Sequence, residues 1–170
     1  GTMLLQYFAD DVQLAAMVFW TFGDVARASW NELTIISVVT GAASIYFIFN
    51  RWNYNAINAG DETARGLGVP VDQIRLIGMV VASLVTATII SFVGIIGFVG
   101  LVCPHMVRRL IGDDHRFLIP GTLVTGALLL LGADTVARIM LAPNVLPVAI
   151  LTAFLGAPVF IYLLIKGYRR

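Results

Sequence analysis

The stretch from Leu76 to Val107 contains no lysine, arginine, aspartate or glutamate. As one straight helix it would be about 48 Å long, because each residue of an α-helix adds about 1.5 Å. The hydrocarbon core of a bilayer is only about 30 Å thick. A single helix would overshoot that core by about 18 Å, so the sequence predicts that the helix is interrupted.

Glycines supply the interruption. In "VGIIGFVGLVCP", Gly94, Gly97 and Gly100 recur at every third position, and Pro104 follows. We expect a span that ends near Phe92, a non-helical segment, and a shorter helix from about Pro104, because proline is tolerated in a first helical turn. Irregular backbone at membrane depth needs cover from protein or water, and broken helices mark transport paths. Alternatively, the glycines only allow close helix packing, and we expect close backbone approach at Gly97.

The composition places the whole chain in a membrane. It is 59% hydrophobic and 12% charged, whereas soluble domains are about 25% charged. The net charge of +1 provides no basic stripe for nucleic acid. We therefore expect an all-α integral membrane protein in a lipid bilayer. It has about five transmembrane helices and an N-terminal helical segment over 4–22, and one span is broken at 94–100. The expected helical membrane segments are 33–49, 73–93, 104–111, 118–141 and 146–165, with a polar loop over 50–75.

The distribution of lysine and arginine predicts the orientation. When five spans alternate, the side that holds the 50–75 loop collects nine basic residues, and the other side holds only Arg27 and Arg138. Because cytoplasmic loops carry the excess of basic residues, the loop and the C-terminus are predicted to be cytoplasmic. The nine are Arg51, Arg65, Arg75, Arg108, Arg109, Arg116, Lys166, Arg169 and Arg170.

The sequence offers little for chemistry. His105 and His115 lie ten positions apart without a nearby ligand pattern, which is a weak metal signal, so no metal site is predicted. The "GDDHR" segment reads as a solvated turn in which Asp113 or Asp114 caps the next helix. No Walker A loop, nucleophile elbow or dinucleotide fingerprint is present. The chain is not predicted to be an enzyme.

Two polar features remain as candidate sites. Asp134 and Arg138 are four residues apart on one helix face, which favours an ion pair. That pair is either purely structural, or it holds an exposed arginine for a partner. The second feature is the 60–69 segment "GDETARGLGV", which is either a solvated loop or a short helix that docks into a groove.

Several segments together resemble one family. They are "FWTFGDVARASW" (19–30), "GDETARGLGV" (60–69), "GFVGLVCPHMVRRLIGDDHRFLIPG" (97–121), "LLLLGADTVARIMLAP" (128–143) and "LPVAILTAFLGAPVFIYLL" (146–164). In order and spacing they resemble the FecCD-type membrane permease of the ABC importers for iron–siderophores, haem and vitamin B12. The resemblance covers nearly all of residues 1–170 and is to the C-terminal half of such a permease.

The resemblance implies partners and roles. Two permease chains pair in the plasma membrane, two ATPases that carry ATP and magnesium dock on the cytoplasmic side, and a binding protein docks outside. No cofactor is implied for this chain. Arg138, with Asp134 beside it, matches an arginine that meets the binding protein. The segment from Gly94 to Gly100 matches an extended segment before a short helix. The ATPase-coupling loop comprises Gly60, Asp61, Glu62, Thr63, Ala64, Arg65, Leu67 and Gly68.

The resemblance also implies the transported cargo. It makes an iron–siderophore complex the first expectation and haem or cobalamin the alternative within the class. A stand-alone membrane channel or scaffold fragment without an ATPase is the alternative from a different class. Large chelates are selected mainly by the binding protein, so the permease sequence does not identify the chelate.

Overall fold

The computed structural model describes residues 10–140 and 147–167, and the secondary structure of these residues is helical. The elements are α2 (Asp11–Thr21), η1 (Val25–Arg27), α3 (Trp30–Phe49), α4 (Arg51–Asn58), α5 (Asp61–Gly66), α6 (Val71–Val93), α7 (Val99–Ile111), α8 (His115–Met140) and α9 (Val148–Gly167). The predicted all-α class is therefore confirmed.

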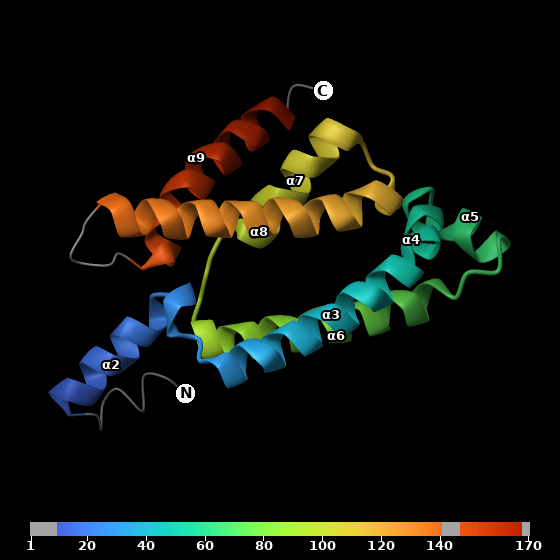
Figure 1. The fold of residues 1–170 in the computed structure, drawn as a ribbon. Helices are drawn as coiled ribbons and strands as arrows, with labels where there is room; N and C mark the ends of the chain where they lie inside the picture. Colours follow the sequence, from blue (N-terminus) through green and yellow to red (C-terminus); the bar gives the residue numbers. More distant parts are fainter. Residues whose placement is uncertain (1–9, 141–146, 168–170) are drawn as a thin grey trace.

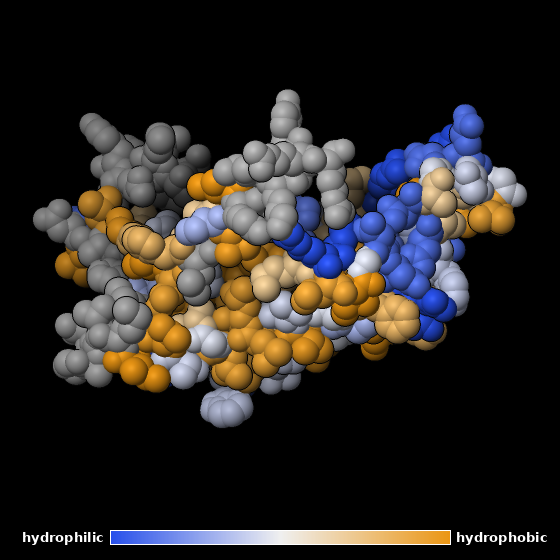
Figure 2. All heavy atoms as spheres, turned by 90° about the horizontal axis from the view of Figure 1, so that it is seen from above, coloured by the Kyte–Doolittle hydropathy of each residue, from blue (hydrophilic) through white to orange (hydrophobic). Residues whose placement is uncertain are grey.

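The helices form two groups that meet at one end. α3 lies along α6, and α7, α8 and α9 pack together (Figure 1). The short helices α4 and α5 lie at one end, where α4 contacts both groups, and α2 and η1 lie towards the opposite end. Hydrophilic side chains gather towards the α4–α5 end, and apolar side chains cover much of the remaining visible face (Figure 2). This separation fits a bundle that crosses an apolar layer.

Among the described residues, three helical segments are long and apolar enough to cross a bilayer: Trp30–Phe49, Val71–Val93 and His115–Ile139. Between 6% and 11% of each span's most apolar window is buried inside the protein. Their apolar side chains therefore need lipid or further protein around them. The other two expected membrane segments are also helical but differ in reach. α7 has 13 residues and spans about 20 Å, and the apolar part found in α9 is Val148–Ile161.

The expected interruption is confirmed. α6 ends at Val93, and α7 begins at Val99 after a non-helical segment. The predicted start near Pro104 is wrong, because Pro104 lies inside α7. Phe98 caps the helix in the left-handed region at φ 66°. Its carbonyl accepts from the backbone N–H of Val102 at 2.8 Å, so the first turn closes before the proline.

Backbone from other segments covers the start of the break. The N–H of Asp24 donates to the carbonyl of Val93 at 2.9 Å, and the N–H of Ala149 donates to the carbonyl of Gly23 at 3.1 Å. Gly94 has φ 82°, and a Cβ added there would lie 2.5 Å from the Trp20 carbonyl oxygen. Protein therefore covers this part of the break, as irregular backbone in a membrane requires.

The close approach expected at Gly97 is wrong. A Cβ added at Gly97 or at Gly100 would meet no atom of the described residues within 4 Å. Gly100 also lies within α7 rather than in the break. The close contact that the sequence placed at Gly97 occurs instead at Gly94, because the chain turns there with positive φ against Gly23.

Most helices begin earlier than predicted. α3 starts at Trp30 because Ser29 and Glu32 form a capping box, in which the Ser29 N–H donates to Glu32 Oε2 at 2.7 Å and the Ser29 hydroxyl accepts from the Glu32 N–H. α8 likewise begins at His115 rather than 118. Positions 4–9, 141 and 146 of the predicted helices, and the basic residues at 169 and 170, lie outside the described residues.

The Gly94 geometry predicts the effect of a single methyl group. Gly94→Ala should lower the free energy of unfolding by roughly 1–3 kcal/mol, since it combines positive φ with a backbone clash. Gly97→Ala is the matched control, because its added methyl group meets open space. Thermal unfolding of both variants in detergent measures the difference. Equal melting temperatures of the two variants would contradict the close packing of Gly94 against Trp20 and Gly23.

Candidate functional site

The loop predicted to dock on a partner is anchored to the rest of the chain at its base. Gly60, with φ 119°, is the N-terminal cap of α5, and Ala64 is fully buried. The Asp61 carboxylate accepts two hydrogen bonds from the Arg75 guanidinium, at 3.0 and 3.2 Å. The Ala64 carbonyl accepts from the Val69 N–H at 3.0 Å. The predicted loop is therefore an ordered short helix anchored to α6.

The outer surface of the loop is free to meet another molecule. Glu62 and Thr63 are exposed, and Leu67 is 70% exposed beside Gly68 at φ 81°. Arg65 pairs with Asp72 at 3.1 Å. The loop therefore presents one large apolar side chain within a polar region.

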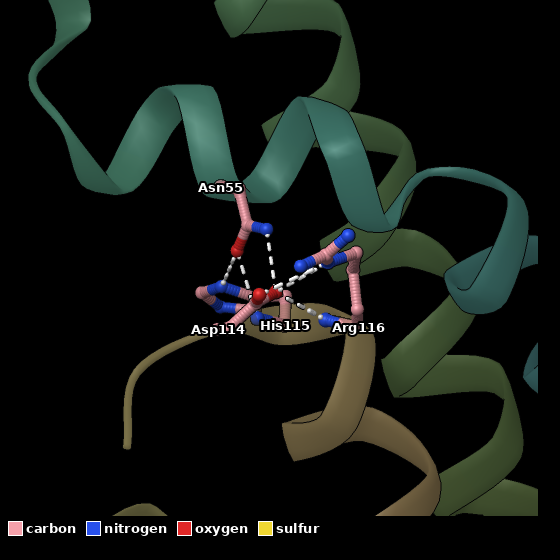
Figure 3. Close-up of polar contacts among 4 residues, drawn as sticks. All are labelled: Asn55, Asp114, His115 and Arg116. Atoms are coloured by element: carbon pink, nitrogen blue, oxygen red, sulfur yellow. Dashed lines mark hydrogen bonds and ion pairs between the residues drawn. The ribbon is translucent and has the colours of Figure 1, made fainter.

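A polar cluster that the sequence did not reveal connects this end to α8 (Figure 3). From α4, the Asn55 amide nitrogen donates to Asp114 Oδ1 at 2.8 Å, and the Asn55 oxygen accepts from the His115 backbone N–H at 2.7 Å. The same oxygen lies 2.9 Å from His115 Nδ1. Asp114 also accepts from the Arg116 N–H at 2.9 Å. The predicted capping role thus belongs to Asp114, whereas Asp113 pairs with Arg108 at 2.7 Å.

Aromatic side chains of α4 add further contacts to the same junction with α8. The Arg116 guanidinium lies over the Trp52 ring at 4.7 Å, and the Tyr54 ring stacks on His115 with centroids 6.0 Å apart. The Tyr54 hydroxyl occupies the space beside Gly78, where an added Cβ would meet it at 2.5 Å. Burial, with Tyr46 adding to the effect, raises the pKa of Tyr54 to about 12, so the phenol stays neutral.

The predicted solvated turn is therefore half-buried. Asp114, His115 and Arg116 are all partly covered, and the Asn55 amide and then the Arg116 N–H lower the pKa of the Asp114 carboxyl to about 2. Asn55 gave no signal in the sequence, because a single asparagine in the polar run "NRWNYNAINAG" has no distinguishing spacing. Its role depends on a contact 59 positions away.

The opposite end of α8 carries the predicted ion pair. Arg138 Nε donates to Asp134 Oδ2 at 2.8 Å, and the Arg138 side chain is 53% exposed, whereas that of Asp134 is 17% exposed. Among the described residues, the buried carboxylate oxygen Asp134 Oδ1 meets no hydrogen-bond partner. The carboxylate therefore binds the guanidinium through Nε, while about half of the Arg138 side chain, 53%, stays exposed.

Metal-ligating residues do not gather within the described part of the chain, where no group of three His, Cys, Asp or Glu side chains could hold an ion. His105 is exposed on α7 and His115 bonds to Asn55. The structure brings the predicted residues together at the two ends of the bundle rather than in one pocket.

One family model and several relatives match this chain. The model of the FecCD transport family matches residues 1–166. A candidate ABC transporter permease of Methanocaldococcus jannaschii is 62% identical over 170 residues, which is all of this chain and 49% of that protein. The hemin transport system permease protein of Yersinia pestis is 39% identical over 163 residues, covering 96% of this chain and 49% of the relative.

A solved structure shares the fold. A candidate metal-chelate type ABC transporter in an inward-facing conformation has a TM-score of 0.89 and 34% sequence identity, covering 96% of this chain and 53% of that chain. The chain thus spans about half the length of the relatives that it matches.

The low pKa of Asp114 predicts a pH dependence with a defined sign. Because the pKa of Asp114 in the folded protein is lowered to about 2 from its usual 3.8, the carboxylate stabilises the fold above about pH 4. That contribution is lost as the pH falls through about 2. The melting temperature should therefore drop between pH 4 and pH 2 in the unaltered protein. The drop should be smaller in Asp114→Asn, whose amide still caps a helix. An equal drop in melting temperature in both proteins would contradict the assignment of this low pKa to Asp114.

Proposed function

The chain belongs to the FecCD transport family, and we propose that it forms part of the membrane permease of an ATP-driven importer of metal chelates. One observation carries the proposal: a membrane helix, α8, is hydrogen-bonded at one end to α4, which leads into α5 and the exposed Leu67, and it carries an exposed arginine at the other end. A permease needs such docking surfaces on both sides of the membrane.

The proposed complex contains two permease chains, two ATPases and one binding protein. ATP and magnesium bind the ATPases, so the permease moves its cargo without hydrolysing ATP itself and holds no cofactor. The loop end and the C-terminus face the cytoplasm of a multi-pass protein in the plasma membrane. The excess of basic residues at that end supports this orientation.

The loop contacts proposed for the ATPase are apolar and polar. Leu67 fills an apolar groove on the ATPase, and Glu62 adds a polar contact at its edge. Arg65 contributes only by sharing its guanidinium with Asp72, to which it is already paired at 3.1 Å. The buried anchor of α5 supports this role, since a preorganised surface loses less entropy on binding.

The proposed cargo is an iron–siderophore complex, with haem or cobalamin as the alternative. A relative named as a hemin transport permease and a solved relative titled as metal-chelate type support the class. The importer should be rebuilt in lipid vesicles from the full-length permease, its ATPase and its binding protein. Uptake of a ferric hydroxamate, haemin and cobalamin should then be compared with and without ATP.

We expect ATP-dependent uptake, fastest for the ferric hydroxamate. Faster uptake of haemin or cobalamin would reassign the cargo within the class. A permease that binds no ATPase and shows no ATP-dependent uptake of any chelate would overturn the proposal in favour of a channel or scaffold.

The loop assignment predicts the effect of a charge at its apolar contact. Leu67→Asp should weaken ATPase binding roughly tenfold, because it places a carboxylate in an apolar groove. Leu110→Asp, at an 81% exposed leucine on α7, is the matched control and should bind normally. Titration of labelled ATPase onto each permease measures both affinities. Normal binding by Leu67→Asp would favour a solvated loop.

The proposed contact between Arg138 and the binding protein predicts the effect of reversing one charge. Arg138→Glu should weaken docking of the binding protein roughly 30-fold, as loss of an interface arginine typically does. Arg138→Lys should restore docking only in part, since a point charge lacks the planar fork that binds a carboxylate. Docking affinity and melting temperature should be measured on each variant. A lower melting temperature with normal docking would show that the Asp134–Arg138 pair is purely structural.

A further inference from the structure

We propose that Asn55 is a positioning residue that fixes α4, together with the α5 segment that follows it, to the first turn of α8. A displacement of this α4–α5 loop, residues 51–68, is then passed along α8 to the Asp134–Arg138 end. The inference rests on the proposed function, because it assigns a route between the two docking surfaces. It concerns a residue that lies in neither surface.

The link is a pair of hydrogen bonds with fixed polarity. The Asn55 amide nitrogen can only donate, and it donates to Asp114 Oδ1 at 2.8 Å. The Asn55 oxygen can only accept, and it accepts from the His115 N–H at 2.7 Å. Early N–H groups of a helix have no partner within the helix. One of those in α8 is thus satisfied by a side chain from α4, which fixes the position of α4 on α8.

The neighbouring contacts make the junction rigid. Trp52 and Tyr54, from the same short helix, contact Arg116 and His115. Asp114 completes the cluster through its ion pair with Arg116 at 2.9 Å. The side chains of this ion pair are 40% and 34% exposed. The junction is therefore shielded from water better than an ordinary surface pair.

The other anchor of the loop is weaker. Two ion pairs link α5 to α6: Arg75–Asp61, with side chains 50% and 45% exposed, and Arg65–Asp72, with side chains 58% and 80% exposed. Exposed ion pairs contribute little because water and salt screen them. When a partner displaces the loop, the loop should therefore follow α8 more closely than α6.

α8 can carry the displacement across the membrane. It is continuous from His115 to Met140 and has 26 residues, which is about 39 Å. Pro120 removes only one backbone hydrogen bond near its start. Arg138 lies in its last turn. Binding at one end should therefore change affinity at the other, and by linkage the effect is reciprocal.

The test exchanges donor and acceptor. Asn55→Asp in the full-length importer places two carboxylates face to face. Asp114→Asn in the same protein restores a donor opposite an acceptor and keeps a capping side chain. Asn53→Asp is the matched control, because Asn53 lies two residues earlier in α4 and bonds Asn50 within the same segment at 3.0 Å. The readout is the stimulation of ATP hydrolysis by the binding protein loaded with the chelate that the unaltered importer transports.

We expect Asn55→Asp to reduce this stimulation about tenfold, within the usual range of coupling between sites. ATPase binding should change far less. The double variant should recover most of the stimulation, and Asn53→Asp should behave as the unaltered protein. Unchanged stimulation in Asn55→Asp would overturn the inference. So would a loss that the double variant fails to restore, or an equal loss in Asn53→Asp.

Hydrogen exchange on the permease alone separates this inference from the proposed function. Asn55→Ala should speed exchange of the His115 N–H, because it removes the oxygen that accepts from this group at 2.7 Å. Unchanged exchange would overturn the link even if the importer works. Failure of the unaltered importer to bind its ATPase would instead overturn the proposed function.

Discussion

Backbone polar groups that leave a helix inside a membrane must find partners in protein, and this requirement shapes the whole chain. Where α6 ends, Asp24 donates to the Val93 carbonyl, and Gly94 turns against Gly23 with no room for a side chain. The turn returns the chain through α7 towards the end from which α6 came. As a result, α8 begins beside the α4–α5 loop and ends at the opposite side.

This route explains why the polar residues lie at two ends. Charges are costly in hydrocarbon, so they remain where they meet water or another charged group. At one end, Asn55 holds the loop to α8, and at the other, Asp134 holds Arg138 in place. Through α4, the same helix is therefore linked to the segment that carries the exposed Leu67, and it carries an exposed guanidinium at its far end. The proposed permease role requires this connection between partners on opposite sides of the membrane.

Much of this arrangement could be predicted from the sequence, and the exceptions have physical causes. The excess length of the apolar stretch predicted the break, and four-residue spacing predicted the Asp134–Arg138 pair, since both depend on local geometry. The sequence assigned the close contact to Gly97 instead of Gly94, because three evenly spaced glycines look alike until φ and neighbours are known. It missed Asn55 because a contact across 59 positions leaves no local pattern.

The central claim is that the loop and the Asp134–Arg138 end of α8 face opposite sides of the membrane, with the loop on the cytoplasmic side. Single cysteines at Leu67→Cys and Ile139→Cys test it directly, because both sites are exposed. They are placed in a permease whose other cysteines, including the buried Cys103, are replaced by alanine. A membrane-impermeant maleimide added to intact cells should label only Ile139→Cys. Added to inverted vesicles, it should label only Leu67→Cys. Labelling of both sites from one side, or the reverse pattern, would contradict the account.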